Sequence, residues 1–201
     1  MYPIFLCDFP VEIPVVEFAI LHTVFTLQQI VKRRATEYSL KKTSRNQMGS
    51  VIPIFSEEWH LFGWLNHQLV PTLEIQCSIS MDGDFVRNVW FPHPVLITPE
   101  AKTDFILFAN EANIELHSGG RFWCNEDMDF AYEIVLSVEI IEKCEEETAR
   151  LLFDIPLAHF RDLHIPFMML ASNVWQADTA ISYIKELREN GCVDNQKYNL
   201  W

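Results

Sequence analysis

The chain has 201 residues, of which 49% are hydrophobic, and a formal net charge of −13. Nucleic acids and anionic membrane surfaces are bound through Lys and Arg, so this charge argues against both kinds of partner. An apolar content this high in a chain of this length predicts one large domain, or one domain with an appendage, and not a disordered segment. The acidity by itself favours solubility and does not specify a function.

The cysteines bear on the cellular compartment. There are five, they are widely spaced, and none forms a CxxC pair. This pattern favours the reduced thiols of a cytoplasmic protein over a disulfide framework or a zinc site. Acidic residues and prolines interrupt the apolar stretch over residues 1–25, so we expect neither a signal peptide nor a membrane span.

The first part of the chain has helical periodicity. Over residues 14–40 the apolar side chains recur at spacings of three and four, which predicts a helix. The polar residues 41–50 are expected to form a loop. Ser56, followed by two glutamates, is a good N-cap and predicts a short helix over residues 59–69.

A strand signal follows. Apolar and polar residues alternate over 73–82, which is typical of a strand with one buried face. Asp82-Gly83 is a hairpin dipeptide, and residues 85–91 are predicted to form the return strand. The first hairpin is therefore expected over residues 73–91.

A helix and a second hairpin are predicted next. Thr98-Pro99-Glu100 resembles a helix start, and the helix should extend over residues 98–116. Its apolar residues Phe105, Phe108, Ala109 and Ala112 are expected on one face. Residues 121–125 and 129–141 then read as two strands joined by an acidic turn at 126–128. The second strand is long enough to predict a bend or a bulge within it.

The remainder of the chain is expected to be helical. A first helix is predicted to reach Phe153, and Pro156 and Pro166 are expected to divide the helical segment that follows. A last helix should cover residues 174–190 and end at Gly191.

The order of these elements predicts an α+β fold. Strands that come as hairpins favour an antiparallel sheet, here built from two hairpins with helices packed on one face. We expect residues 1–72 to form an N-terminal helical segment packed on the main domain. Residues 73–201 would then form an α+β domain with C-terminal helices.

Residues 105–141 carry a family resemblance. A helix with Asn110 and Asn113 is followed by a short strand with an aromatic pair, an acidic turn and a longer strand. Together with the flanking elements over about 73–171, this order resembles the YbjN-type domains, also called type III secretion chaperone-like domains. The resemblance implies a secretion-chaperone-like fold, a homodimer, and a role in protein binding or regulation.

The leading functional hypothesis is a non-enzymatic, cytoplasmic protein that binds a protein partner or client segment. Its acidic surface would favour a basic or amphipathic client. Partner-binding side chains are expected among the aromatic residues Trp59, Phe62, Trp64 and Trp90, because aromatic anchors are enriched at interfaces. The alternative for these residues is packing in the core.

Two other functional classes remain open. No GxSxG, HExxH, phosphate-binding loop or EF-hand pattern occurs, so no catalytic residue, metal or cofactor is expected. His60 and His67, with Glu57 one helical turn from His60, have a spacing that permits a metal-dependent enzyme or a small-molecule site near the 56–69 helix. An immunity or inhibitor protein is the third possibility, because an acidic protein suits a basic toxin.

Overall fold

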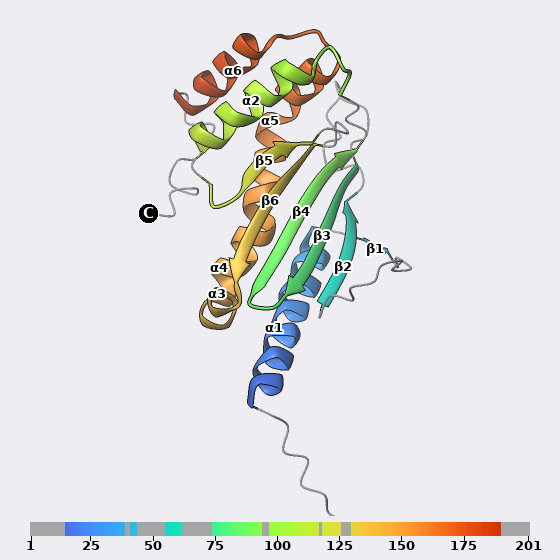
Figure 1. The fold of residues 1–201 in the computed structure, drawn as a ribbon, viewed down its shortest axis with the longest axis vertical. Helices are drawn as coiled ribbons and strands as arrows, with labels where there is room; N and C mark the ends of the chain where they lie inside the picture. Colours follow the sequence, from blue (N-terminus) through green and yellow to red (C-terminus); the bar gives the residue numbers. More distant parts are fainter. Residues whose placement is uncertain are drawn as a thin grey trace, which may run out of the picture.

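The computed structural model of the protein describes residues 15–38, 41–43, 55–61, 74–93, 97–116, 118–125 and 130–189 (Figure 1). The strands are β1 (Lys41–Thr43), β2 (Phe55–Leu61), β3 (Glu74–Asp82), β4 (Phe85–His93), β5 (Arg121–Cys124) and β6 (Phe130–Ser137). The helices are α1 (Val15–Glu37), α2 (Lys102–Leu116), α3 (Val138–Lys143), α4 (Glu145–Ala149), the π-helix η1 (Arg150–Asp154), α5 (Ile155–Ala171) and α6 (Ala177–Glu189).

The strands form one antiparallel sheet in the order β1-β2-β3-β4-β6-β5. Both predicted hairpins belong to it because β4 of the first pairs with β6 of the second. The predicted α+β class with an antiparallel sheet is therefore confirmed. β1 and β2 extend the sheet beyond the two hairpins. Because β2 pairs with β3, one sheet contains residues from both sides of the boundary expected between residues 72 and 73.

Helices cover one face of this sheet. Figure 1 shows α1 and α5 behind the strands, with α2 and α6 together at one end of the molecule. The side chain of Trp90 on β4 points to the helices, where its indole Nε1 donates a 3.0 Å hydrogen bond to the carbonyl oxygen of Leu152. The amide Nδ2 of Asn88 donates to the same oxygen at 2.6 Å. The core thus lies between the helices and the even-numbered side chains of β4.

The π-helix has a physical explanation in Pro156. This residue has no N–H, so it cannot donate the usual helical hydrogen bond to the carbonyl of Leu152, four residues earlier. A buried carbonyl without a donor is unfavourable, and π-bulges often occur where the regular ladder is interrupted. The buried donors of Asn88 and Trp90 satisfy this oxygen. The helical run therefore continues from α4 through η1 into α5.

Two predictions for the first part of the chain were wrong. Phe55–Leu61 is a strand and not the start of a helix, and Lys41–Thr43 is a strand within the predicted loop. Phe55–Leu61 forms a strand because it pairs with β3, which would otherwise present a row of unpaired backbone groups at an edge of the sheet. The rest of the helix predicted over 59–69 lies outside the described residues.

The second hairpin also differs from its prediction. β6 ends at Ser137, and residues 138–141, expected to continue the strand, begin α3. The reason is that β4 begins at Phe85, which is paired with Ser137, so a longer β6 would have no partner there. The backbone N–H of Val138 instead donates to the carbonyl of Asp84 in the hairpin turn, at 2.8 Å.

The prolines and the first turn give two further corrections. Pro166 lies inside α5 and does not divide it, and Pro156 lies where η1 continues into α5, with Asn88 and Trp90 donating to the Leu152 carbonyl that Pro156 cannot reach. The β3–β4 turn consists of Gly83 and Asp84, one residue later than predicted, with Gly83 at a φ of 55°. A positive φ at the first central residue is what glycine permits in a tight hairpin.

None of the helices in the described ranges combines the length and the apolar character needed to cross a bilayer.

Candidate binding surface

The face of the sheet opposite the helices is the candidate site. Residues directly opposite each other on neighbouring strands share a face, and successive residues alternate. Because Asn88 and Trp90 face the helices, the odd-numbered residues of β4 and their partners on β6 and β5 face away from them. We call this surface the open face; its described members on these three strands are Phe85, Arg87, Val89, Phe91, Arg121, Trp123, Ala131, Glu133, Val135 and Ser137.

An ion cluster lies at the centre of the open face. Glu133 on β6 accepts hydrogen bonds from the guanidinium groups of Arg87 on β4 and Arg121 on β5, the latter at 3.2 Å. Burial alone would raise the pKa of Glu133, but the two arginines outweigh it and lower the pKa. The carboxylate therefore stays ionised and holds two guanidinium groups, whose side chains are 55% and 72% exposed.

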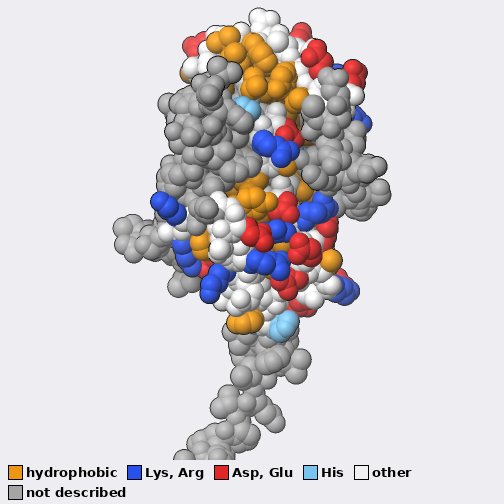
Figure 2. Space-filling view, turned by 180° about the vertical axis from the view of Figure 1, so that it is seen from behind, with side chains coloured by type: hydrophobic (Ala, Val, Ile, Leu, Met, Phe, Trp, Pro, Cys, Tyr) orange, Lys and Arg blue, Asp and Glu red, His pale blue; other side chains and the backbone are white. Residues whose placement is uncertain are grey.

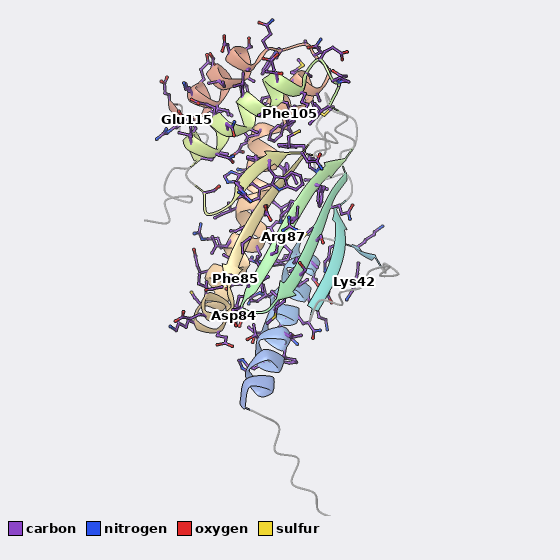
Figure 3. The ribbon with its side chains drawn as sticks, viewed as in Figure 1. Lys42, Asp84, Phe85, Arg87, Phe105 and Glu115 are labelled. Atoms are coloured by element: carbon purple, nitrogen blue, oxygen red, sulfur yellow. The ribbon has the colours of Figure 1, made fainter. Side chains whose placement is uncertain are left out.

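Apolar side chains continue the open face towards the β3–β4 turn. Phe85 is 57% exposed and Val135 is 51% exposed. They are diagonal neighbours, because Phe85 pairs with Ser137 and Arg87 pairs with Val135. Figure 3 shows Phe85 near the turn and Arg87 further along the same strand. An exposed apolar pair thus adjoins an exposed arginine.

A small pocket borders the other end of the open face. It has a volume of about 260 Å³ and lies between α2 and β5. Arg121 and Trp123 line it from the open face, and Asn110 and Asn113 line it from α2. Phe91 packs against Trp123 at the edge of the pocket: the two rings lie edge to face, with 6.2 Å between their centroids. The pocket therefore combines amide and guanidinium groups with an aromatic wall.

Asn113 joins α2 to β5 beside this pocket. Its Nδ2 donates to the carbonyl of Phe122 at 2.9 Å, and its Oδ1 accepts from the N–H of Phe122 at 2.6 Å. The amide thereby occupies the outer edge of β5 as a neighbouring strand would, which closes that edge of the sheet.

Asn113→Ala is therefore expected to lower the free energy of unfolding by about 1–3 kcal/mol, because two backbone groups of β5 lose their partners. Chemical denaturation measures this loss. The matched control is Asn110→Ala, which removes an exposed amide on the same helix and should change stability by less than about 0.5 kcal/mol. Equal losses for both variants would contradict the role given to Asn113.

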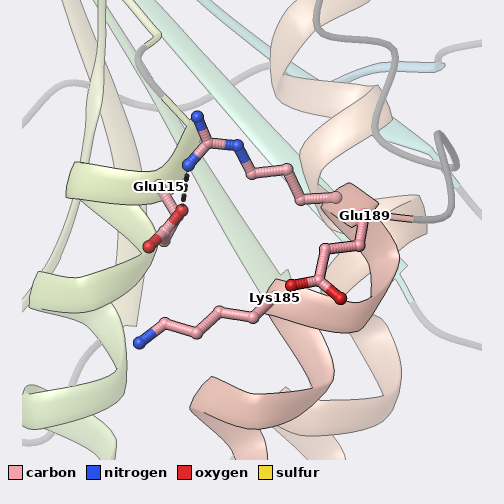
Figure 4. A pocket seen from close by; sticks show the side chains of 4 residues that line it. Glu115, Lys185 and Glu189 are labelled. Atoms are coloured by element: carbon pink, nitrogen blue, oxygen red, sulfur yellow. Dashed lines mark hydrogen bonds and ion pairs between the residues drawn. The ribbon is translucent and has the colours of Figure 1, made fainter.

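A second pocket, of about 450 Å³, lies between α2 and α6 (Figure 4). It is lined by Glu115, Lys185, Arg188 and Glu189. Arg188 pairs with Glu115, and Lys185 pairs at 3.2 Å with Glu111 on α2. These ion pairs join the two helices, so we assign this pocket a structural role.

A charged cluster on the helix side fastens α1 to the rest of the fold. Arg34 contacts Glu146 at 2.9 Å and Asp154 at 3.1 Å, and the hydroxyl of Tyr38 donates to Asp154 at 2.9 Å. Burial raises the pKa of Asp154, although Tyr38 and Arg34 act in the opposite direction. Figure 2 shows basic and acidic side chains interleaved in the middle of this face. Arg34 and Tyr38 already bind the carboxylates of Glu146 and Asp154, so we assign this cluster the role of holding α1 in place.

The structure places the predicted aromatic anchors in different environments. Trp90 is fully buried in the core. Trp59 on β2 is partly buried against the core, and its Nε1 donates to Glu57 at 3.1 Å. Phe62 and Trp64 lie outside the described residues. Trp59 and Trp90 both belong to the helix-facing side of the sheet, since each pairs with Cys77.

The helical spacing behind the alternative metal site does not exist at Glu57 and His60, because both belong to strand β2. Glu57 is bound by Lys42 and Trp59. His67 lies outside the described residues. Over the described parts of the chain, no three His, Cys, Asp or Glu side chains come together as metal ligands.

Sequence reasoning missed the open face as a site. The available signal was the mixed face of the second strand, where the charged Glu133 lies between Ala131 and Val135 at alternate positions. Arg87, between Phe85 and Val89 at alternate positions of the return strand, was a second signal. Neither signal indicates which face of the sheet the helices cover. In addition, Arg87 and Arg121 lie on different strands and come together only because β4 and β5 both pair with β6.

Comparison with known proteins gives no match: no protein-family model, no curated protein and no solved structure matches the chain. The kinship with YbjN-type domains stays a prediction. Any functional proposal must therefore be based on the surface itself.

Proposed function

We propose that this protein is a non-enzymatic protein-binding module that holds a segment of a partner protein on its open face. The observation that carries this proposal is the adjacency of exposed Phe85 and Val135 to Arg87 and its ion cluster. Aromatic and arginine side chains are enriched among the residues that dominate interface energies. A sheet face bearing both kinds of side chain suits an extended or helical segment better than a compact small molecule.

The size of the adjoining pocket supports the same function. Small-molecule sites usually enclose about 300–1,000 Å³ and bury most of their ligand. The pocket between α2 and β5 has about 260 Å³ and opens beside the open face. It suits one side chain of a docked segment, and binding through it requires no reacting group.

A peptide selection tests the proposal. A phage-displayed library of random 12-residue peptides is selected on the full chain, and the affinity of an enriched synthetic peptide is measured by fluorescence anisotropy. The double variant Phe85→Ser/Val135→Thr should weaken this affinity by at least tenfold, because it removes the apolar anchors.

The matched control is Phe25→Ser/Val174→Thr, which changes an exposed phenylalanine on α1 and an exposed valine after α5. These two residues are 60% and 64% exposed. The control should bind like the unchanged protein. Failure to enrich any peptide, or equal affinities for the two double variants, would refute a binding role for the open face.

Two further expectations belong to this proposal. We propose a cytoplasmic location, which the free thiols of Cys77 and Cys144 support. We also propose a homodimer, as the resemblance implies, and sedimentation equilibrium tests it. If the chain dimerises and Phe85→Ser/Val135→Thr makes it monomeric, the occupant of the open face is a second copy and not a separate partner.

A further inference from the structure

We propose that the open face and its pocket recognise an acidic partner segment, with one carboxylate side chain of that segment bound at Arg121 in the pocket between α2 and β5. This inference rests on the proposed function and specifies its partner. It differs from the basic or amphipathic client that the net charge of the whole chain favours. The reason is that the local charge of the site is opposite to the charge of the chain.

The local charge comes from the strands that form the site. On β4, β6 and β5, the described charged side chains of the open face are Arg87, Arg121 and Glu133, which sum to a positive charge. A positive site on a chain of net charge −13 provides a specific location for an anionic group. Charge complementarity of this kind guides the register and orientation of a partner.

The arginines are already positioned for a second carboxylate. A guanidinium group carries five N–H donors in a fixed plane, and pairing with one carboxylate leaves other donors available. Arg121 gives one nitrogen to Glu133 at 3.2 Å while its side chain remains 72% exposed. Glu133, held between two strands, therefore restricts Arg121 and Arg87 before a partner arrives, which lowers the entropy lost on binding.

The pocket provides the place where the carboxylate would lie. Arg121 and Trp123 form its open-face side, and Asn110 on α2 is exposed at its opposite side. Its volume of about 260 Å³ exceeds the space required by an aspartate or glutamate side chain. Val135 and Phe85 lie further along the same face, so the segment should carry an apolar residue besides its acid.

The selection described above gives the first readout. Enriched 12-residue peptides should contain Asp or Glu together with an aromatic or aliphatic residue. Peptides that are enriched, lose affinity with Phe85→Ser/Val135→Thr, and are nevertheless basic or uncharged would overturn the acidic partner while leaving the binding function intact. Absence of any enriched peptide would overturn both.

The second readout is a double-mutant cycle between the protein and one enriched synthetic peptide. Arg121→Gln should weaken binding at least tenfold, and replacing the acidic residue of the peptide by its amide should produce a similar loss. The two changes together should cost little more than either alone, because they remove the same contact. Arg87→Gln should also weaken binding, and circular dichroism confirms that both variants are folded.

The matched control is Arg161→Gln on α5, on the helix side of the molecule. Arg161 pairs with its neighbour Asp162, and its side chain is 53% exposed, close to the 55% of Arg87. It should bind the peptide like the unchanged protein. Equal affinities for Arg121→Gln, Arg87→Gln and Arg161→Gln would refute the recognition of a carboxylate by these arginines.

Discussion

Replacing Trp90 by alanine is expected to lower the free energy of unfolding by about 3–5 kcal/mol, which is the usual loss for a large aromatic side chain in a core. Trp90 is completely buried and packs edge to face on Phe153 of η1 at 5.8 Å between ring centroids. Its indole N–H is also one of two side-chain donors to the Leu152 carbonyl, to which Pro156 has no N–H to donate. Urea denaturation of the two proteins measures the difference.

Trp90→Phe separates packing from hydrogen bonding. The phenyl ring keeps most of the contact with Phe153 but removes the indole N–H that donates to the Leu152 oxygen, so a smaller loss of about 1–2 kcal/mol is expected. Peptide affinity, measured where this variant is folded, should be unchanged. A Trp90→Ala protein of normal stability that has lost binding would show instead that Trp90 belongs to a contact surface.

The stability of the protein should fall on mild acidification because of His159. This side chain is fully buried in α5, with its ring 5.2 Å from the ring of Tyr132 between centroids. Burial lowers the pKa of His159 from 6.5 to about 3. Between these two pH values the unfolded chain binds a proton that the native protein does not, so protonation favours unfolding.

The expected slope is roughly 1.4 kcal/mol of unfolding free energy for each pH unit well below 6.5. Glu133, whose pKa is lowered from 4.5, contributes a loss of the same sign at lower pH, so the comparison is made between pH 6.5 and 5. In this range His159→Phe and His159→Leu should both show a much flatter dependence than the unchanged protein. Equal slopes in all three proteins would mean that His159 is not the group responsible.

The elements that local patterns determine were predicted well. The alternation over residues 73–82 indicated which side of β3 is buried, and Ile75, Cys77, Ile79 and Met81 are all inaccessible. The helical spacing in α2 likewise indicated a buried side that includes Phe105 and Phe108. In both cases the hydrophobic period specifies the element and its orientation.

The elements that long-range pairing determines were not predicted. Ser56 and the two glutamates after it resemble a helix start, and it is the pairing with β3 that makes the strand the better structure. The end of β6, Ser137, is set by the first residue of β4, Phe85, which lies 52 positions earlier in the chain. The open face has the same origin, because Arg87, Arg121 and Glu133 are neighbours only across strands.

Side-chain oxidative footprinting tests most directly whether the open face is the binding surface. The protein is exposed to hydroxyl radicals with and without a selected peptide at saturation, and the oxidation of each residue is measured by mass spectrometry. Binding at the open face predicts strong protection of Phe85, with unchanged oxidation of Phe25, which is similarly exposed on α1. Protection of Phe25 with no change at Phe85 would contradict the proposal.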